Sequence, residues 1–123
     1  MKAVILENVW LQRLRLNSFL GGLGVETDLM TRYVKDVWTY VRYHALGDGE
    51  GVIFFIDYTW QSDSVKLAEY VVDNFPLAKV VLCCNQGDNY WYLPVEIADH
   101  VLVTIRPYEL ERIQKAVYYG GVT

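Results

Sequence analysis

Cysteine is scarce in this chain, and what there is excludes several kinds of site. The two cysteines among 123 residues are the neighbours Cys83 and Cys84. Adjacent side chains on a strand point to opposite faces, so these two are poorly placed to bond to each other and a disulfide framework is excluded. There is no CxxC pair, and His44 and His100 are isolated, which leaves a zinc site almost without support.

Positive charge and long apolar runs are also in short supply. Eleven Lys and Arg residues face fifteen Asp and Glu residues, giving a net charge of −4, and the largest basic cluster is Arg13 with Arg15. A nucleic-acid-binding surface needs more than this. No apolar run approaches the roughly 20 residues of a membrane span, and the first residues lead into a strand pattern without a signal peptide. We therefore expect a cytoplasmic protein with no nucleic-acid or membrane partner.

Short apolar runs are plentiful and define the expected sheet. The composition is 53% hydrophobic, enough for one domain over residues 1–123 that buries about two-thirds of its unfolded surface. Continuous β-branched and aromatic runs are typical of strands covered on both faces. Strands are predicted over 2–6, around 24–27, and over 51–57, 79–84 and 101–105.

Segments whose apolar residues recur at helical spacing lie between these predicted strands. We expect a first helix with Asn8 as N-cap, with Trp10, Leu11, Leu14 and Phe19 at helical spacing, and with an end at Gly21-Gly22. A second helix is expected to begin at Thr27 or Asp28. Its apolar stripe is interpreted as core rather than as a cofactor site, and consists of Met30, Tyr33, Val34, Val37, Trp38, Val41 and Ala45.

The second half of the chain continues the alternation. Ser62 or Asp63 can cap a third helix that stops before Pro76. The fourth helix is predicted to be short or missing, with one turn around 95–98. The last helix spans 108–119, with inward positions at Leu110, Ile113, Ala116 and Val117. Strands that alternate with helices indicate an α/β domain, a five-stranded parallel sheet with helices on both faces.

Three charged residues follow or close the predicted strands. Glu7 follows the first strand, Asp57 closes the third, and Arg106 follows the fifth and precedes Pro107. In a parallel sheet of order 2-1-3-4-5 these ends meet at one edge, beside the point where the strand order reverses. Two plainer interpretations stay open. Asp57 can simply start a turn over 57–60, and Arg106 can pair with Asp57 in a structural salt bridge.

This constellation resembles the receiver (CheY-like) domain of two-component response regulators, which has a flavodoxin-like fold. The resemblance covers the whole chain in element order and depends on Glu7, Asp57, the Arg106-Pro107 step and the helix behind it. It implies that Asp57 accepts a phosphoryl group, that Glu7 and Asp57 hold Mg²⁺, and that Arg106 contacts the phosphoryl oxygens. It also implies a cis bond before Pro107.

The chain departs from the receiver pattern at three positions. Asn8 stands where a second acid is usual, Cys83 or Cys84 where a hydroxyl is usual, and Arg106 where lysine is usual. A thiol is a weak hydrogen-bond partner, and arginine has a planar fork that lysine lacks. These departures favour a pseudo-receiver, which uses the scaffold for binding without the phosphorylation switch, at least as much as a working receiver.

An aromatic loop suggests how such a domain acts. Tyr90, Trp91 and Tyr92 are consecutive, so they cannot all face one core. Exposed Tyr and Trp are favoured at protein contacts. We therefore expect a homodimer or protein-partner interface built from this loop and from the last helix with Tyr108.

Two other classes of function are weighed against the signalling domain. A small-molecule or nucleotide-binding domain could use the same strand-edge crevice, but residues 7–11 contain no glycine-rich phosphate loop. A metal-dependent phosphoryl-transfer or hydrolytic enzyme would need more acids than Glu7 and Asp57, with Asp63 and Asp88 as the candidates for addition. The leading expectation is a non-enzymatic, stand-alone regulatory domain.

Overall fold

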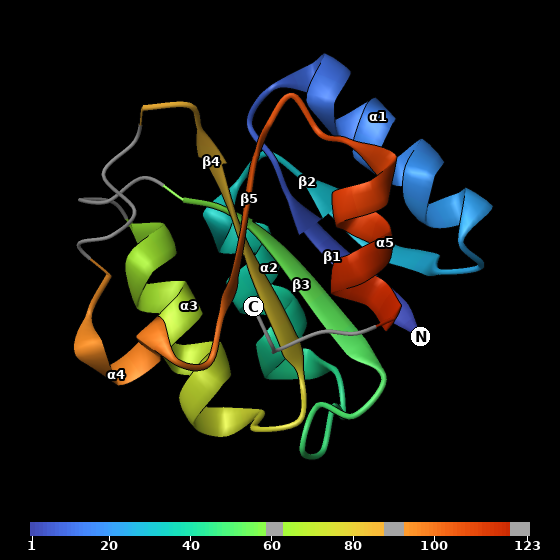
Figure 1. Cartoon of the computed structure of the whole chain (residues 1–123). Helices are drawn as coiled ribbons and strands as arrows, with labels where there is room; N and C mark the ends of the chain where they lie inside the picture. Colours follow the sequence, from blue (N-terminus) through green and yellow to red (C-terminus); the bar gives the residue numbers. More distant parts are fainter. Residues whose placement is uncertain (59–62, 88–92, 119–123) are drawn as a thin grey trace.

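A single parallel sheet of five strands forms the centre of the molecule (Figure 1). The structure is a computed structural model, and it describes residues 1–58, 63–87 and 93–118. The strand order is β2-β1-β3-β4-β5, as the sequence predicts. The strands are β1 (Lys2–Leu6), β2 (Glu26–Thr31), β3 (Val52–Asp57), β4 (Lys79–Asn85) and β5 (Leu102–Arg106).

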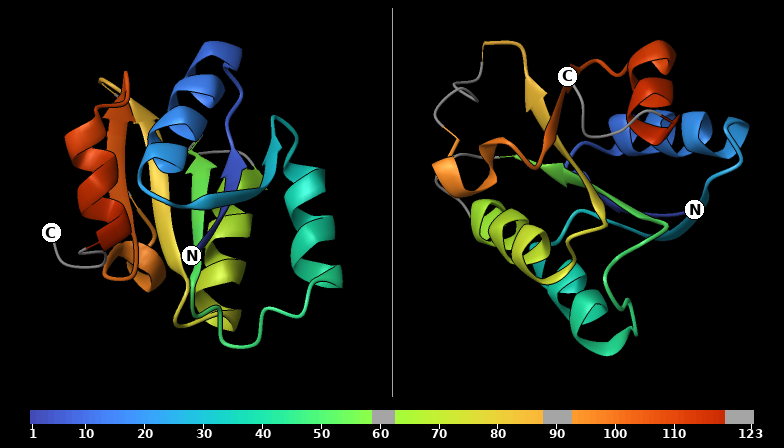
Figure 2. Two further views of the ribbon diagram at one scale, coloured as in Figure 1. Left: turned by 90° about the vertical axis from the view of Figure 1, so that its right-hand side faces the viewer. Right: turned by 60° about the horizontal axis from the view of Figure 1, so that its bottom comes forward.

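Helices cover both faces of this sheet, which confirms the expected doubly wound arrangement. Helices α1 and α5 lie side by side on one face, and α2, α3 and α4 lie on the other (Figures 1 and 2). Their bounds are α1 (Trp10–Gly22), α2 (Val34–Tyr43), α3 (Asp63–Asn74), α4 (Val95–Ala98) and α5 (Leu110–Tyr118).

Strand alternation divides the core into two layers. Phe54 points into the layer shared with α2 and α3, and its neighbour Phe55 points into the layer shared with α1 and α5. Both side chains are fully buried. Five consecutive buried residues in β3 are therefore explained by helices on both sides of the central strand.

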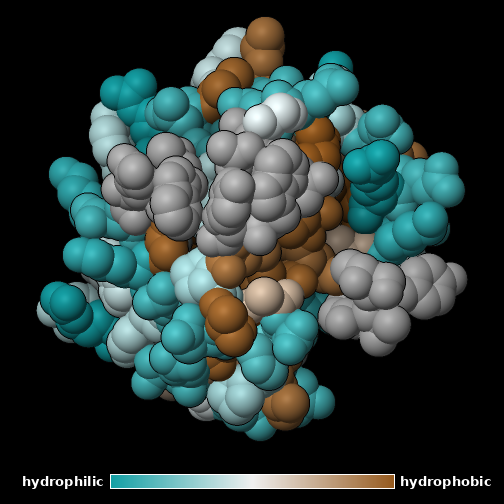
Figure 3. Space-filling view, turned by 60° about the vertical axis from the view of Figure 1, so that its left-hand side comes forward, coloured by the Kyte–Doolittle hydropathy of each residue, from teal (hydrophilic) through white to brown (hydrophobic). Residues whose placement is uncertain are grey.

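Helix α4 has the single turn that the sequence predicts. Because it is so short, β5 is incompletely covered on this side, and Val103 and Ile105 are only partly buried. The space-filling view of this side shows apolar surface gathered in its middle (Figure 3).

The first helix differs from its prediction in phase and at its N-terminus. Its N-cap is Val9, and no side chain in the described part of the chain caps it. Trp10, Leu11 and Leu14 are exposed, while Leu16 and Leu20 face the core. Periodicity could not determine which face is buried, because apolar residues lie on both sides of this helix and form two alternative stripes.

The end of α1 lies at the predicted glycine pair, because Gly22 is its last residue. Gly21 and Gly22 belong to the helix, and the left-handed residue that terminates it is Gly24, with φ of 78°. The amide of Val25 donates to the carbonyl of Leu20 across this glycine. This bonding satisfies the last carbonyls of the helix as a Schellman-type cap does.

The prediction that the second helix begins at Thr27 or Asp28 is wrong. Residues 26–31 form β2, and α2 begins at Val34. Strand β2 lies at the edge of the sheet and alternates between exposed and covered residues, so Met30 is exposed rather than part of a helical stripe. The helix ends before Ala45, whose expected core position is exposed.

Smaller differences concern helices α3 and α5. Leu110 is exposed, whereas Ile113, Ala116 and Val117 are buried as predicted. Helix α3 begins at Asp63, and the alternative cap Ser62 lies outside the described residues, as does Tyr119. No helix in the described ranges combines the length and apolar character that crossing a bilayer requires.

Gly49 provides a direct test of the loop before β3. Its φ is +87°, and an added Cβ would lie 2.7 Å from the Cβ atoms of both Phe75 and Ala78. We expect Gly49→Ala to lower the free energy of unfolding by about 3 kcal/mol, because backbone strain and overpacking combine. Urea denaturation followed by circular dichroism measures this loss.

Gly47→Ala is the matched control for that substitution. Gly47 has a φ of +61°, but no described atom lies within 4 Å of an added Cβ. Only the left-handed backbone penalty applies there, about 1–2 kcal/mol. Equal losses in the two variants would show that the contact with Phe75 and Ala78 has no effect.

Candidate functional site

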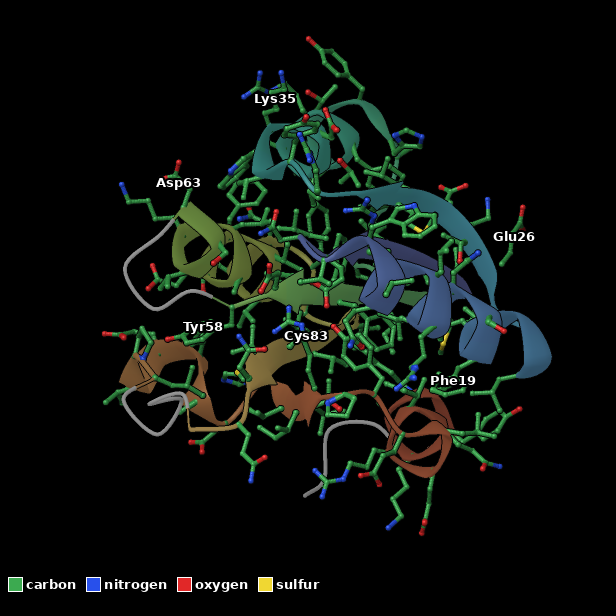
Figure 4. All side chains as sticks on the ribbon, turned by 90° about the horizontal axis from the view of Figure 1, so that it is seen from above. Phe19, Glu26, Lys35, Tyr58, Asp63 and Cys83 are labelled. Carbon is green, nitrogen blue, oxygen red and sulfur yellow. The ribbon has the colours of Figure 1, made fainter. Side chains whose placement is uncertain are left out.

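Three charged side chains meet at the carboxyl edge of the sheet. Glu7 comes directly after β1, Asp57 is the last residue of β3, and Arg106 is the last residue of β5. Figure 4 views the molecule from above, and Cys83 of β4 lies near the centre of that view. The structure thus brings together the three residues that sequence reasoning expected to converge.

The guanidinium of Arg106 is the centre of this cluster. Its Nε lies 2.5 Å from Glu7 Oε1, and its Nη2 lies 2.9 Å from Glu7 Oε2 and 2.6 Å from Asp57 Oδ1. Its Nη1 donates to the carbonyl oxygen of Cys83 at 3.1 Å and to Asn85 Oδ1 at 3.3 Å. The planar fork of arginine therefore joins the ends of β1, β3 and β4 to β5, which a single ammonium group could not do.

Glu7 is enclosed by hydrogen-bond donors. Besides the two bonds from Arg106, Oε1 accepts from the Tyr108 hydroxyl at 2.7 Å, and Oε2 accepts from the Val9 amide at 3.2 Å. The side chain is fully buried. A carboxylate offers about four lone-pair positions, so these donors use its accepting capacity.

Asp57 is held less completely than Glu7. Its Oδ1 accepts from Arg106, and its Oδ2 accepts from the Asn8 amide at 3.3 Å. The side chain remains 21% exposed. Burial raises the pKa of Asp57, and the opposing influence of Arg106 and the Asn8 amide does not cancel this rise. Asp57 is the part of the cluster that faces solvent.

The ionisable neighbours keep their usual charge states. Burial disfavours the Arg106 cation, but the hydrogen bond with Glu7 and the nearby negative charges outweigh it and raise the pKa of Arg106. Burial, with Cys83 and Glu7 nearby, raises the pKa of Tyr108, so its hydroxyl stays a donor. Counted by formal charge, two carboxylates and one guanidinium give the cluster one net negative charge.

These side chains do not fit the Mg²⁺ site that the receiver resemblance implies. Magnesium binds through carboxylate oxygens with free lone pairs, whereas those of Glu7 are occupied by Arg106, Tyr108 and Val9. The position beside it is Asn8, which contributes its backbone amide to Asp57. Within residues 1–58, 63–87 and 93–118, no group of three or more His, Cys, Asp or Glu side chains could hold a metal ion.

The end of β4 contributes a residue that the sequence analysis missed. Cys83 and Cys84 are both fully buried, and burial raises the pKa of the Cys83 thiol to about 12, so it remains a neutral thiol. The polar side chain that reaches Arg106 is that of Asn85, which pairs with Arg106 in the sheet register. The signal was available, because Asn85 is the first polar residue after an apolar run.

Tyr108 also has a different place from the predicted one. It was expected at an interface, yet it is 2% exposed and donates to Glu7. Tyr108 lies two residues after Arg106, and its hydroxyl reaches Glu7 at the strand edge. The Arg106–Pro107 bond is cis, as the resemblance implies. The other predicted interface residues, Tyr90, Trp91 and Tyr92, lie outside the described residues, as does Asp88.

Comparisons with known proteins identify this architecture. No family model and no curated protein sequence matches the chain. Solved structures do match: a response regulator from Thermotoga maritima superposes with a TM-score of 0.73 at 14% identity, covering 96% of this chain and 94% of its own. Chemotaxis protein CheY4 from Vibrio cholerae gives 0.73 at 8% identity, with 96% of each chain covered.

A third similar structure is a dimer. The beryllofluoride-activated NtrC4 receiver domain has a TM-score of 0.70 at 12% identity, covering 98% of this chain and 95% of its own. Identities this low establish the fold rather than a shared activity. The chain therefore has the fold of the response-regulator receiver domains. In this chain a carboxylate–guanidinium cluster occupies the carboxyl edge of the sheet.

Proposed function

We propose that this protein is a receiver-like regulatory domain that acts through protein–protein interaction and works without phosphorylation or Mg²⁺. The observation that carries the proposal is the position of Arg106, whose guanidinium donates to Glu7 and Asp57 at once. A cation belonging to the protein stands between the carboxylates that a metal ion would otherwise bring together.

Electrostatics argues against Asp57 as a phosphoryl acceptor. Phosphorylation would replace the single charge of the Asp57 carboxylate with the larger charge of an acyl phosphate, about −1.5 to −2, and so add negative charge to a cluster that is already negative by one. The charge of Arg106 is used by Glu7 and Asp57, and accepting a phosphoryl group at Oδ1 would break the 2.6 Å bond to Nη2. The loss of that bond would leave Arg106 paired with Glu7 alone.

The same charge argument weighs against the nucleotide-binding alternative. A net negative strand edge repels phosphate groups instead of attracting them. The signalling role is supported by the solved receiver structures with this fold, one of which is a dimer. A regulatory domain that binds other proteins is the function that accommodates both the fold and the occupied strand edge.

Phosphotransfer tests this proposal directly. We expect incubation with acetyl phosphate and MgCl₂ to leave the intact mass of the protein unchanged, because Arg106 occupies both carboxylates. Mass spectrometry measures the product. A mass increase that maps to Asp57 and is lost on mild base treatment would overturn the proposal.

The double variant Asn8→Asp, Arg106→Lys is the matched control. It supplies a second acid and replaces the five donors of the guanidinium with the three of an ammonium group, so fewer carboxylate oxygens are occupied. We expect Mg²⁺ to raise its melting temperature by a few degrees, as a ligand that binds the folded state does. The wild type is expected to show no such shift at the same Mg²⁺ concentration.

Single substitutions in the cluster should show which of its interactions contributes most to the free energy of unfolding. Arg106→Ala leaves Glu7 buried without a counter-ion, so we expect a loss of about 3–5 kcal/mol in the free energy of unfolding. Tyr108→Phe removes one of the donors to Glu7 and should cost about 1–3 kcal/mol. Urea denaturation measures both, and a loss for Tyr108→Phe as large as that for Arg106→Ala would contradict the central place of the ion pair.

A further inference from the structure

Helix α1 has an outer face that no described part of the chain covers. Helices α1 and α5 lie beside each other on the outside of the molecule (Figure 2, left). The exposed residues of α1 form one stripe at helical spacing, called here the α1 outer face. It consists of Trp10, Leu11, Leu14, Arg15, Ser18, Gly21 and Gly22.

The composition of this face is unusual for a helix in water. Of its seven residues only Arg15 is charged, and Trp10, Leu11 and Leu14 are 61%, 66% and 41% exposed. The solvent side of a surface helix is normally polar or charged. The neighbouring helix α5 is closer to that rule: between its exposed apolar residues at the two ends, its exposed positions are polar or charged and include the pair Glu111–Lys115. Large apolar side chains gathered on one exposed helix face mark an interaction surface.

Residue size along this face is ordered. The large apolar residues are all at the N-terminal end, at positions 10, 11 and 14, and the small residues are all at the C-terminal end, at positions 18, 21 and 22. Each large residue is as far before position 16 in the sequence as one small residue is after it. If a second α1 ran antiparallel across the first, Trp10 would lie against Gly22, Leu11 against Gly21, and Leu14 against Ser18.

No contact or backbone conformation in the described part of the monomer requires glycine at positions 21 and 22. No described atom lies within 4 Å of a Cβ built on Gly21 or Gly22, and neither has a positive φ. Gly24, in contrast, needs its φ of 78° to end the helix. Glycine lowers helix stability relative to alanine, so this pair weakens α1 without any internal packing benefit. What it provides is room for a large side chain from outside.

We infer that the α1 outer face binds a second copy of this chain, with the two α1 helices antiparallel about a two-fold axis beside position 16. An isologous interface requires a self-complementary surface, and large residues that face small ones supply it. A contact between two helices of 13 residues is at the small end of specific interfaces, so the dimer is weak, with a dissociation constant of about 10 µM or higher.

Charge gives this dimer a recognisable salt dependence. Arg15 lies next to the two-fold axis, so its guanidinium approaches that of the partner, and each chain carries a net charge of −4. Both repulsions are screened by salt. Dimerisation should therefore strengthen as ionic strength rises, whereas binding of an acidic partner helix to Arg15 would weaken.

Sedimentation equilibrium of the whole chain between about 10 µM and 1 mM tests the inference. We expect a reversible dimer for the wild type and at least a tenfold rise in the dissociation constant for Gly21→Leu. The leucine fits the free monomer, because nothing lies near position 21, but it collides with Leu11 of the second copy. Gly21→Leu adds apolar surface, so non-specific association would instead increase.

Controls separate this surface from general effects. Leu110→Ala removes a side chain of similar exposure from α5 and should leave the dissociation constant unchanged. Gly21→Ala should weaken the dimer less than Gly21→Leu, and its melting temperature should equal or exceed that of the wild type. A wild type that stays monomeric at 1 mM, or a Gly21→Leu variant that dimerises as well as the wild type, overturns the inference. Neither result affects the phosphotransfer test, because Arg106 is not part of this surface.

Discussion

The ion pair between Glu7 and Arg106 is the constraint on which the rest of this strand edge depends. Glu7 is fully buried and follows β1, the strand at the point where the order of the sheet reverses. An ionised carboxylate in that position is costly to bury unless it is paired and hydrogen-bonded. Arg106 supplies the pairing with two bonds, and the Tyr108 hydroxyl and Val9 amide supply the rest.

The pairing of Glu7 with Arg106 constrains the position of the surrounding strands more than it adds to the free energy of unfolding. Replacing a buried ion pair by apolar residues is often neutral, whereas removing one partner is strongly destabilising. What the pair provides is position: Arg106 can reach Glu7, Asp57 and the Cys83 carbonyl only if β1, β3, β4 and β5 end at one level. Tyr108 further fixes the path of the chain into α5. The same bonds that align the strands leave Glu7 without capacity for a metal ion.

The sequence predicts the central strands and the convergence of the three charged residues, but not the edge strand β2 or the other side chains of the cluster. Strands covered on both faces, such as β3, are continuous apolar runs that have few other interpretations. Edge strand β2 alternates, and Met30 also fits a helical stripe with Val34 and Val37, so local periodicity could not distinguish strand from helix. The convergence of residues 7, 57 and 106 followed from topology alone. Asn85 could have been placed at this edge as the first polar residue after β4. Its bond with Arg106 and the bond of Tyr108 with Glu7 depend on how far these side chains reach, which the sequence pattern does not contain.

The sequence does not show which face of α1 packs against the core, and the same distribution of apolar residues explains the exposed apolar face of this helix. Apolar residues on both sides of a helix conceal which side is the core, and only tertiary packing places Leu16 and Leu20 in the core cluster that also contains Ala3 and Ile5. The stripe that is not selected, Trp10, Leu11 and Leu14, is then left facing water. It begins one residue after Val9, whose amide is fixed by Glu7. The buried ion pair therefore holds the first turn of α1 in place, and a rigid first turn lowers the entropic cost of any contact made there.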